Sequence, residues 1–226
     1  MSIKKVRIPK YSLGEEISNA ISHGLGAIFG LISLILMLIK VIPTNDFYKI
    51  FSASIYGSSL IILFTISCLY HSLKKNNAKR IMRIIDHVTI YFLLAGSYTP
   101  YTLVTMREQN IWGWGNGTVG YIMLGFVWFT CIIGIIFNVI NVDKYAWISM
   151  ICYLLAGWII VLALVALWPI LGNIGASLLL SSGIVYTVGA VIYGFGHKIK
   201  YFHTIFHIFV LIGAILMFVS IYCFVY

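Results

Sequence analysis

Charged side chains are scarce in this chain. Asp, Glu, Lys and Arg together make up 9% of its 226 residues, whereas hydrophobic residues make up 61%. A soluble domain of this length does not need so much apolar surface, because only its core is hidden from water. The composition therefore excludes a soluble globular protein and indicates one that faces lipid as well as its own core.

Cysteine is also sparse, and no CxxC spacing occurs. The four cysteines lie singly in different apolar runs, at Cys68, Cys131, Cys152 and Cys223. This pattern argues against a disulfide framework, and we interpret the thiols as small buried hydrophobic groups. Residues 1–23 lack the apolar segment and the cleavage site of a signal peptide. With no long linker and no internal repeat, we expect a single domain over residues 1–226.

Long apolar runs dominate the rest of the chain. Each contains about 20 residues, the length that spans a hydrocarbon core. The seven runs are Gly24–Ile42, Phe47–Tyr70, Ile84–Val104, Thr118–Ile140, Tyr145–Trp168, Ile174–Phe195 and Phe202–Tyr226. Only Pro169 and Gly172 separate the fifth run from the sixth. The sequence thus predicts an all-α integral membrane protein with a seven-helix transmembrane bundle.

The distribution of Lys and Arg predicts the orientation of this bundle. If the N-terminus is cytoplasmic, 12 of the 15 cationic residues fall on the cytoplasmic side, and only Lys40, Lys49 and Arg107 fall outside. Cytoplasmic loops carry such an excess, so we expect the N-terminus inside and the C-terminus outside. The net charge of +9 then needs no nucleic-acid partner, because anionic lipid of the inner leaflet balances it.

A helix start precedes the first apolar run. Ser12 and Glu15 have the spacing of a capping box, which predicts a short cytoplasmic helix at about residues 12–24. Glu16, Asn19 and His23 would share one stripe of that helix. Two interpretations are open: a solvated face of an interfacial helix, or contact with a functional site at the same membrane level.

Three histidines and one aspartate are the strongest functional signal. His203 and His207 are spaced i, i+4, so on a helix both imidazoles project from one face. His71 ends the second run and Asp86 opens the third. The orientation above, which used none of these residues, places all four at the cytoplasmic end. Imidazole and carboxylate ligands with one open position are typical of catalytic zinc, so we expect zinc here.

Neighbouring residues fit a supporting role. Ser67 lies one turn before His71 and would contact a ligand or the bound water. Asp86 would either bind the metal directly or hold the metal-bound water as a general base, and both roles are open. His87 points about 100° away from Asp86 around a helix, and His197 lies in a basic loop. We expect neither histidine to bind the metal.

The ordered motifs resemble the haemolysin III family, the bacterial branch of the progestin and adiponectin receptor superfamily. They are Glu16-x-x-Asn19-x-x-Ser22-His23-x-x-Gly26, Ser67-x-x-x-His71, Asp86 and His203-x-x-x-His207. The resemblance implies a seven-helix bundle with a cytoplasmic N-terminus and a zinc bound by the three histidines. It also implies that Asp86 lies beside the zinc-bound water and that Ser67 belongs to the site.

Two classes of function follow from these expectations. The leading hypothesis is a zinc-dependent intramembrane hydrolase of a lipid amide or ester, because the superfamily includes ceramidase-like members. Its partner would be an acyl lipid of the cell membrane, and its role membrane lipid homeostasis. The alternative is a non-enzymatic protein, either a lipid or stress sensor with structural zinc or the pore-forming cytolysin that the family name records. The short tail argues against carrying over hormone binding.

Overall fold

The computed structural model describes residues 3, 6–195 and 199–226, and these residues form a helical protein. The helices are α1 (Leu13–Val41), α2 (Phe47–Ser72), α3 (Asn77–Pro100), α4 (Thr118–Asn141), α5 (Ala146–Trp158), α6 (Ile160–Phe195) and α7 (Phe202–Phe224), with short helical turns at Ile42–Thr44 and Tyr101–Thr105. Within the described ranges, β-pairing is limited to one isolated bridge between Ile111 and Trp114.

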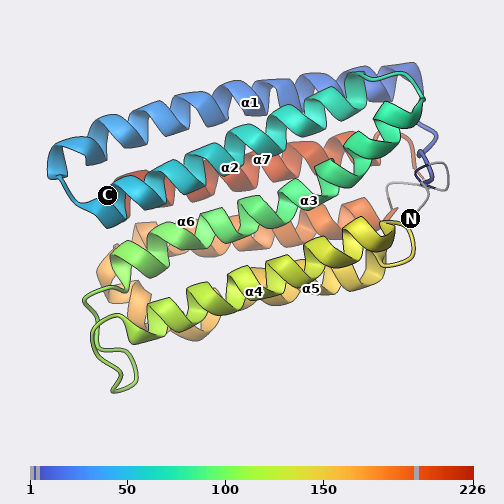
Figure 1. Ribbon diagram of the computed structural model, residues 1–226. Helices are drawn as coiled ribbons and strands as arrows, with labels where there is room; N and C mark the ends of the chain where they lie inside the picture. Colours follow the sequence, from blue (N-terminus) through green and yellow to red (C-terminus); the bar gives the residue numbers. More distant parts are fainter. Residues whose placement is uncertain (1–2, 4–5, 196–198) are drawn as a thin grey trace.

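The helices lie side by side in an elongated bundle (Figure 1). α2 packs between α1 and α3, α6 packs on α7, and α1 also contacts α7. The start of α1 and the end of α7 lie at opposite ends of the bundle (Figure 1). The end of α2, the start of α3 and the start of α7 therefore share one end with the start of α1.

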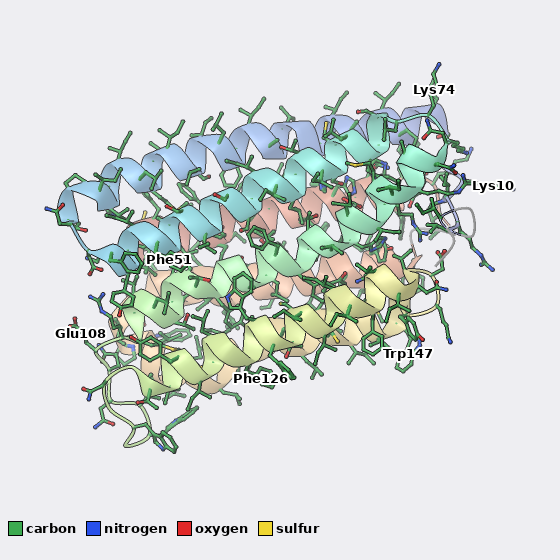
Figure 2. The ribbon with its side chains drawn as sticks, viewed as in Figure 1. Lys10, Phe51, Lys74, Glu108, Phe126 and Trp147 are labelled. Carbon is green, nitrogen blue, oxygen red and sulfur yellow. The ribbon has the colours of Figure 1, made fainter. Side chains whose placement is uncertain are left out.

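The outer surface of the bundle is apolar, while several polar groups point inward. Along α1, exposed residues recur at helical spacing at Ile17, Ile21, Leu25, Ile28, Ile32, Ile35 and Ile39. Asn19 and His23 on the same helix are buried. In Figure 2, the labelled aromatic residues Phe51 and Phe126 lie along the length of the bundle, and the labelled charged residues Lys10, Lys74 and Glu108 lie at its ends. This pattern, with apolar residues outside and polar residues inside, is the reverse of that in a soluble protein and suits a protein that is surrounded by lipid.

Five helical stretches are long and apolar enough to cross a membrane: Leu13–Thr44, Phe47–Ser72, Thr118–Asn141, Ala146–Phe195 and Phe202–Phe224. The predicted third run, Ile84–Val104, is not among them. Its helix α3 begins earlier, at Asn77, where Asn76 caps the backbone N–H of Lys79. The first turns of α3 therefore contain cations, which lower its mean hydropathy.

The predicted start of α1 is confirmed, but the predicted boundary near Gly24 is absent. Ser12 is the N-cap, and it exchanges hydrogen bonds with Glu15 as a capping box. From Leu13 the helix continues without a break to Val41. The predicted cytoplasmic helix and the predicted first span are thus one element, because a single glycine inside a packed helix need not end it.

The predicted separation of the fifth and sixth runs is confirmed at Gly172, whose φ of 65° and ψ of 173° are not helical. A second interruption, at Ile159, was not predicted. There the hydroxyl of Tyr98 donates to the carbonyl of Gly157 at 2.7 Å and accepts from the N–H of Ile160 at 3.2 Å. At this interruption, the side chain of Tyr98 on α3 therefore supplies hydrogen bonds to backbone groups that would otherwise pair within the helix.

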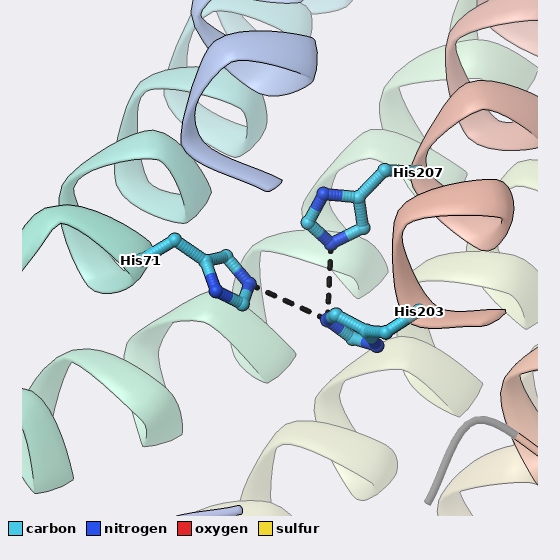
Figure 3. Close-up of side chains that lie close together, drawn as sticks. All are labelled: His71, His203 and His207. Carbon is cyan, nitrogen blue, oxygen red and sulfur yellow. Dashed lines mark hydrogen bonds between the residues drawn. The ribbon is translucent and has the colours of Figure 1, made fainter. Parts of the chain in front are cut away.

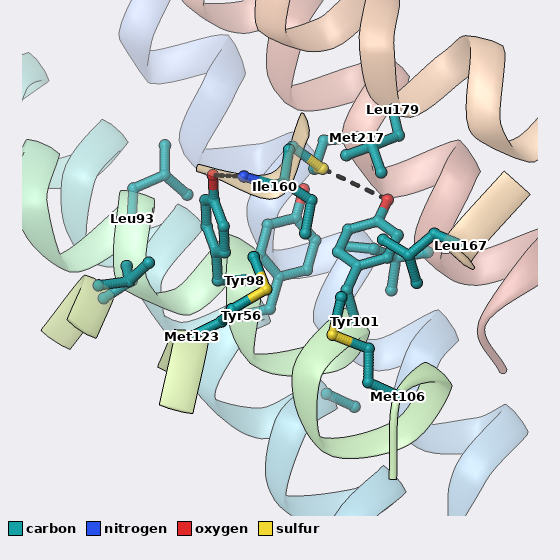
Figure 4. Packing of buried hydrophobic residues seen from close by; sticks show 14 of the residues in the cluster. Tyr56, Leu93, Tyr98, Tyr101, Met106, Met123, Ile160, Leu167, Leu179 and Met217 are labelled. Atoms are coloured by element: carbon teal, nitrogen blue, oxygen red, sulfur yellow. Dashed lines mark hydrogen bonds between the residues drawn. The ribbon is translucent and has the colours of Figure 1, made fainter. Parts of the chain in front are cut away.

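Buried tyrosines and methionines fill the middle of the bundle (Figure 4). The hydroxyl of Tyr101 donates to Ser220 Oγ at 2.8 Å and lies 3.4 Å from the sulfur of Met217. Close helix contact occurs where residues are small: a Cβ on Gly57 would lie 2.6 Å from Leu34. Satisfied hydroxyls and small residues are the usual means of packing helices in lipid.

Candidate metal centre

Three buried histidines meet at one end of the bundle (Figure 3). His71 lies in the last turn of α2, and His203 and His207 lie on one face of the first turns of α7. Nε2 of His203 is 3.3 Å from Nε2 of His71 and 3.1 Å from Nε2 of His207. One ligand atom from each of the three residues lies within 4.8 Å of the others.

These separations fit a bound metal ion. Tetrahedral bonds of about 2.0–2.1 Å place neighbouring ligand atoms about 3.3 Å apart. Without a metal ion, hydrogen bonds among the Nε2 atoms of the three histidines satisfy these atoms poorly, because a neutral imidazole has one donor and one acceptor. A cation at the centre would accept a lone pair from each ring.

The outward nitrogens of two rings support the same arrangement. Nδ1 of His71 lies 2.8 Å from Oε2 of Glu16, and Nδ1 of His207 lies 3.4 Å from Oγ of Ser22. The hydroxyl of Ser22 donates to the carbonyl of Asn19, so toward His207 it acts as an acceptor. Both rings are therefore protonated on Nδ1, which leaves the lone pair of Nε2 directed at the centre.

Glu16 also connects this cluster to a buried cation. Nζ of Lys79 lies 2.6 Å from Oε1 of Glu16 and donates to the carbonyl of Leu73 at 3.0 Å. Lys79 is 1% exposed, although the sequence suggested an ordinary cytoplasmic loop lysine. A buried charge needs a partner, and Glu16 supplies one. The interpretation of the Glu16, Asn19 and His23 stripe as a solvated face is therefore wrong.

The segment before α1 covers the cluster. The ring of Tyr11 stacks on that of His203, with centroids 5.0 Å apart and planes inclined by 20°. Arg83 fixes this segment by donating to the carbonyl of Arg7 at 2.6 Å and to Asp143 at 2.7 Å. Burial raises the pKa of the Tyr11 hydroxyl above its usual range, so it remains protonated.

Asp86 and Ser67 lie beside the histidines rather than among them. Ser67 and Asp86 line the same cavity, and the Asp86 carboxylate interacts electrostatically with Ser67, His71 and Arg83. Among the residues that the structure describes, the group of close metal-ligand atoms contains the three histidines without Asp86. Ser67 is buried and lies one turn before His71 on α2.

A cavity of ≈ 210 Å³ begins at this cluster and continues into the bundle. His203, His207, Ser67 and Asp86 line its polar end. Its lining residues run along α3 from Asp86 to Tyr101, just beyond the end of that helix, and at 1.5 Å per helical residue these two positions lie about 22 Å apart. Apart from the polar end, the lining is mostly apolar.

The structure thus brings together the five residues that the sequence singled out: Ser67, His71, Asp86, His203 and His207. His87 lies on the same helix as Asp86, with its ring 6.3 Å from that of Tyr193, outside the three-histidine group. His197, also predicted not to bind metal, lies outside the described residues. Sequence reasoning missed Tyr11 and Lys79, because neither stands in a recognisable spacing with the histidines.

The fold and the site define a multi-pass membrane protein with a buried three-histidine cluster at one end of the helical bundle. The sequence pattern of the family described as Haemolysin-III related matches residues 11–218. The chain belongs to this haemolysin III family and is a membrane protein of the bacterial type.

Two curated bacterial relatives cover almost the whole chain. Hemolysin-3 of Bacillus cereus is 36% identical over 218 residues, which are 96% of this chain and 94% of that protein. The Hemolysin-3 homolog of Bacillus subtilis (strain 168) is 36% identical over 215 residues, 94% of this chain and 96% of that protein. The monocyte to macrophage differentiation factor of Homo sapiens is more distant, at 27% identity over 188 residues, 81% of this chain and 74% of that protein.

Proposed function

We propose that this protein is a zinc-dependent hydrolase that cleaves an acyl amide or ester of a membrane lipid. One observation carries the proposal: three imidazoles converge at the polar end of a mostly apolar cavity, where His203 and His207 line the wall together with the carboxylate of Asp86. A structural metal site has no need of such a cavity. A lipid hydrolase needs both parts, one for the scissile bond and one for the acyl chain.

His71, His203 and His207 would hold the zinc. Three protein ligands leave one position for water or substrate, as in catalytic zinc sites. When bound, zinc would lower the pKa of a water ligand toward neutrality and polarise the substrate carbonyl. Glu16 would keep His71 in the tautomer that presents Nε2.

Asp86 is the proposed general base. It would accept the proton of the attacking water and return it to the leaving group, while the Ser67 hydroxyl holds its carboxylate in position. In this role Asp86 does not bind zinc directly, in keeping with its place beside the histidine group.

The apolar part of the cavity would receive the acyl chain. Its lining residues extend over about 22 Å along the bundle, against the roughly 15 Å of one leaflet, half of a hydrocarbon core, so the apolar wall runs in the direction in which an acyl chain would lie. The head group would lie at the end that carries Arg83, Lys79 and the other cations. This arrangement favours a substrate of the cytoplasmic leaflet.

The direct test is release of fatty acid by the purified protein in a mixed-lipid bilayer, with and without a chelator. We expect release that the chelator abolishes and added zinc restores. Stoichiometric zinc without turnover on any acyl amide or ester lipid would instead favour a sensor with a structural metal.

The proposal includes seven membrane crossings with the N-terminus in the cytoplasm. The five apolar stretches give seven crossings if α3 also spans and the stretch Ala146–Phe195 crosses twice, turning at Gly172. The cationic excess orients the bundle. In a cysteine-free background, Lys10→Cys should label from the cytoplasmic side and Glu108→Cys from the other side, since both residues are exposed and lie at opposite ends (Figure 2). Labelling of both from one side would contradict this topology.

A further inference from the structure

His23 is a fourth histidine at the cluster, and it lies outside the group of three metal-ligand candidates. It belongs to α1 and is 4% exposed. Its ring stacks face to face on that of His207, with centroids 3.6 Å apart and planes inclined by 16°. The ring of Phe64 meets it edge-on at 5.1 Å. His23 is therefore held rigidly between α2 and α7.

Both ring nitrogens of His23 lack a hydrogen-bond partner among the described residues. This differs from His71 and His207, whose Nδ1 atoms have partners. Leaving a buried polar group unpaired costs about 1–3 kcal/mol. A phenylalanine would stack on His207 without that cost, so packing alone does not account for an imidazole here.

The surroundings of His23 indicate what its nitrogens would bind. His23 lines the same cavity as Ser67, Asp86, His203 and His207. A neutral imidazole offers one N–H donor and one acceptor. A ligand whose polar end lies against the three histidines would bring an acceptor oxygen next to this donor.

We propose that His23 binds the polar end of the acyl ligand, with its ring N–H donating to the carbonyl oxygen of the substrate or to the carboxylate of the fatty-acid product. The inference rests on the proposed acyl ligand, and it holds whether or not that ligand is hydrolysed. His23 would orient the carbonyl relative to Asp86, while the chain fills the apolar part of the cavity.

The test measures ligand binding and not turnover. The full-length, metal-loaded protein in phospholipid nanodiscs is titrated with palmitate labelled with ¹³C at the carboxyl carbon, and both the Kd and the ¹³C shift of the bound form are recorded. His23→Phe keeps an aromatic ring against His207 and deletes both nitrogens. We expect it to retain the parent's metal content, to bind palmitate about tenfold more weakly and to move the bound carboxyl shift.

Two further variants make the result specific. His23→Gln restores an N–H donor and should recover part of the affinity. Ser33→Ala is the matched control: Ser33 lies on the same helix and is buried, its hydroxyl is also unpaired among the described residues, and it does not belong to the cavity lining. It should bind palmitate like the parent. If His23→Phe does not fold, His23→Leu deletes the same nitrogens in a smaller volume.

Three results would overturn the inference: a parent protein that does not bind palmitate, a nitrogen-free variant with the parent's Kd and carboxyl shift, or loss of metal in that variant at unchanged palmitate affinity. Failure of the proposed hydrolysis is a separate outcome. If palmitate binding depends on His23 while no lipid is cleaved, the hydrolase proposal fails and the role of His23 stands.

Discussion

The carboxylate of Glu16 accepts a 2.8 Å hydrogen bond from Nδ1 of His71, across the contact between α1 and α2. Since a carboxylate cannot donate, this contact assigns the proton of His71 to Nδ1 and the lone pair to Nε2. Carboxylate partners of this kind raise the basicity of a metal-binding imidazole and fix its orientation.

Glu16→Gln should therefore weaken metal binding about 10–100-fold, the usual effect of losing such a partner. The measurement is competition with a fluorescent zinc chelator in detergent. Glu15→Gln is the matched control, because Glu15 caps α1 and bonds the backbone N–H of Tyr201 instead. Equal zinc affinity in Glu16→Gln and the parent would show that Glu16 is not a partner of the site.

Removing Lys79 together with Glu16 should separate stability from metal affinity. Glu16→Gln alone leaves the ammonium of Lys79, 1% exposed, without its carboxylate. Breaking a buried pair at one side typically costs about 3–5 kcal/mol, whereas replacing both partners is often nearly neutral. Glu16→Gln/Lys79→Met should thus melt at a higher temperature than Glu16→Gln and still bind zinc weakly. A double variant that melts no higher than Glu16→Gln would show that an unpaired Lys79 ammonium is not the cause of the lost stability.

The three histidines should bind one zinc per chain. Alanine in place of His71, His203 or His207 should cut metal content sharply, because two imidazoles do not close the site. His87→Ala should leave metal content nearly unchanged, since His87 lies outside the group. Elemental analysis of purified protein gives the answer. Stoichiometric zinc in a His203→Ala/His207→Ala variant would refute the assignment.

The residues that sequence alone could identify are those whose geometry is local. The i, i+4 spacing places His203 and His207 on one helix face whatever the tertiary structure, and the capping box of Ser12 and Glu15 spans a single turn. His71 and Asp86 could be placed because each lies at the end of a predicted membrane span, and a span end can face only one of the two sides of the membrane. Each of these predictions needed only the period of a helix and the direction of a span.

What the sequence did not reveal depends on contacts between distant segments. From the sequence, Lys79 is one of several cations in a basic loop. Only the folded structure shows that Glu16, 63 residues away, packs against it. The interruption at Ile159 follows from the Tyr98 hydroxyl, which belongs to another helix. The run of α1 through Gly24 reflects packing that overrides a weak local signal.

Acid should weaken an ion pair at the other end of the bundle. Arg107 donates to both oxygens of Asp46, at 3.0 and 2.8 Å, and with the backbone N–H groups of Tyr48 and Lys49 it lowers the pKa of Asp46 to about 2. A lowered pKa in the folded state stabilises the protein above the unfolded value of about 3.9 and loses that contribution as pH falls from about 4 toward 2.

Asp46→Asn tests this, because asparagine remains a good N-cap for α2 while it removes the charge and one of the two oxygens that accept from Arg107. Melting temperatures are compared at pH 6 and pH 3. Parent and variant should differ at pH 6, and the difference should be about halved at pH 3 because Asp46 is only partly protonated there, a comparison in which protonation of the histidines cancels. A difference that is the same at both pH values would mean that the pair does not titrate in this range.

A substitution of Asp86 distinguishes a role in catalysis from a role in metal binding. Asp86→Asn keeps the size of the side chain and one hydrogen-bonding oxygen for Ser67, but it loses the basicity that proton transfer requires. If Asp86 is the general base, zinc should be largely retained by the three imidazoles, and fatty-acid release should fall by about 10²–10⁴-fold. If Asp86 instead binds the metal directly, zinc content and thermal stability should fall together. Both quantities are measured on one preparation, with Asp46→Asn as the control for loss of a carboxylate far from the cluster. Full zinc with undiminished release would remove Asp86 from the proposed reaction, and a base would then have to be sought among the other polar residues of the cavity.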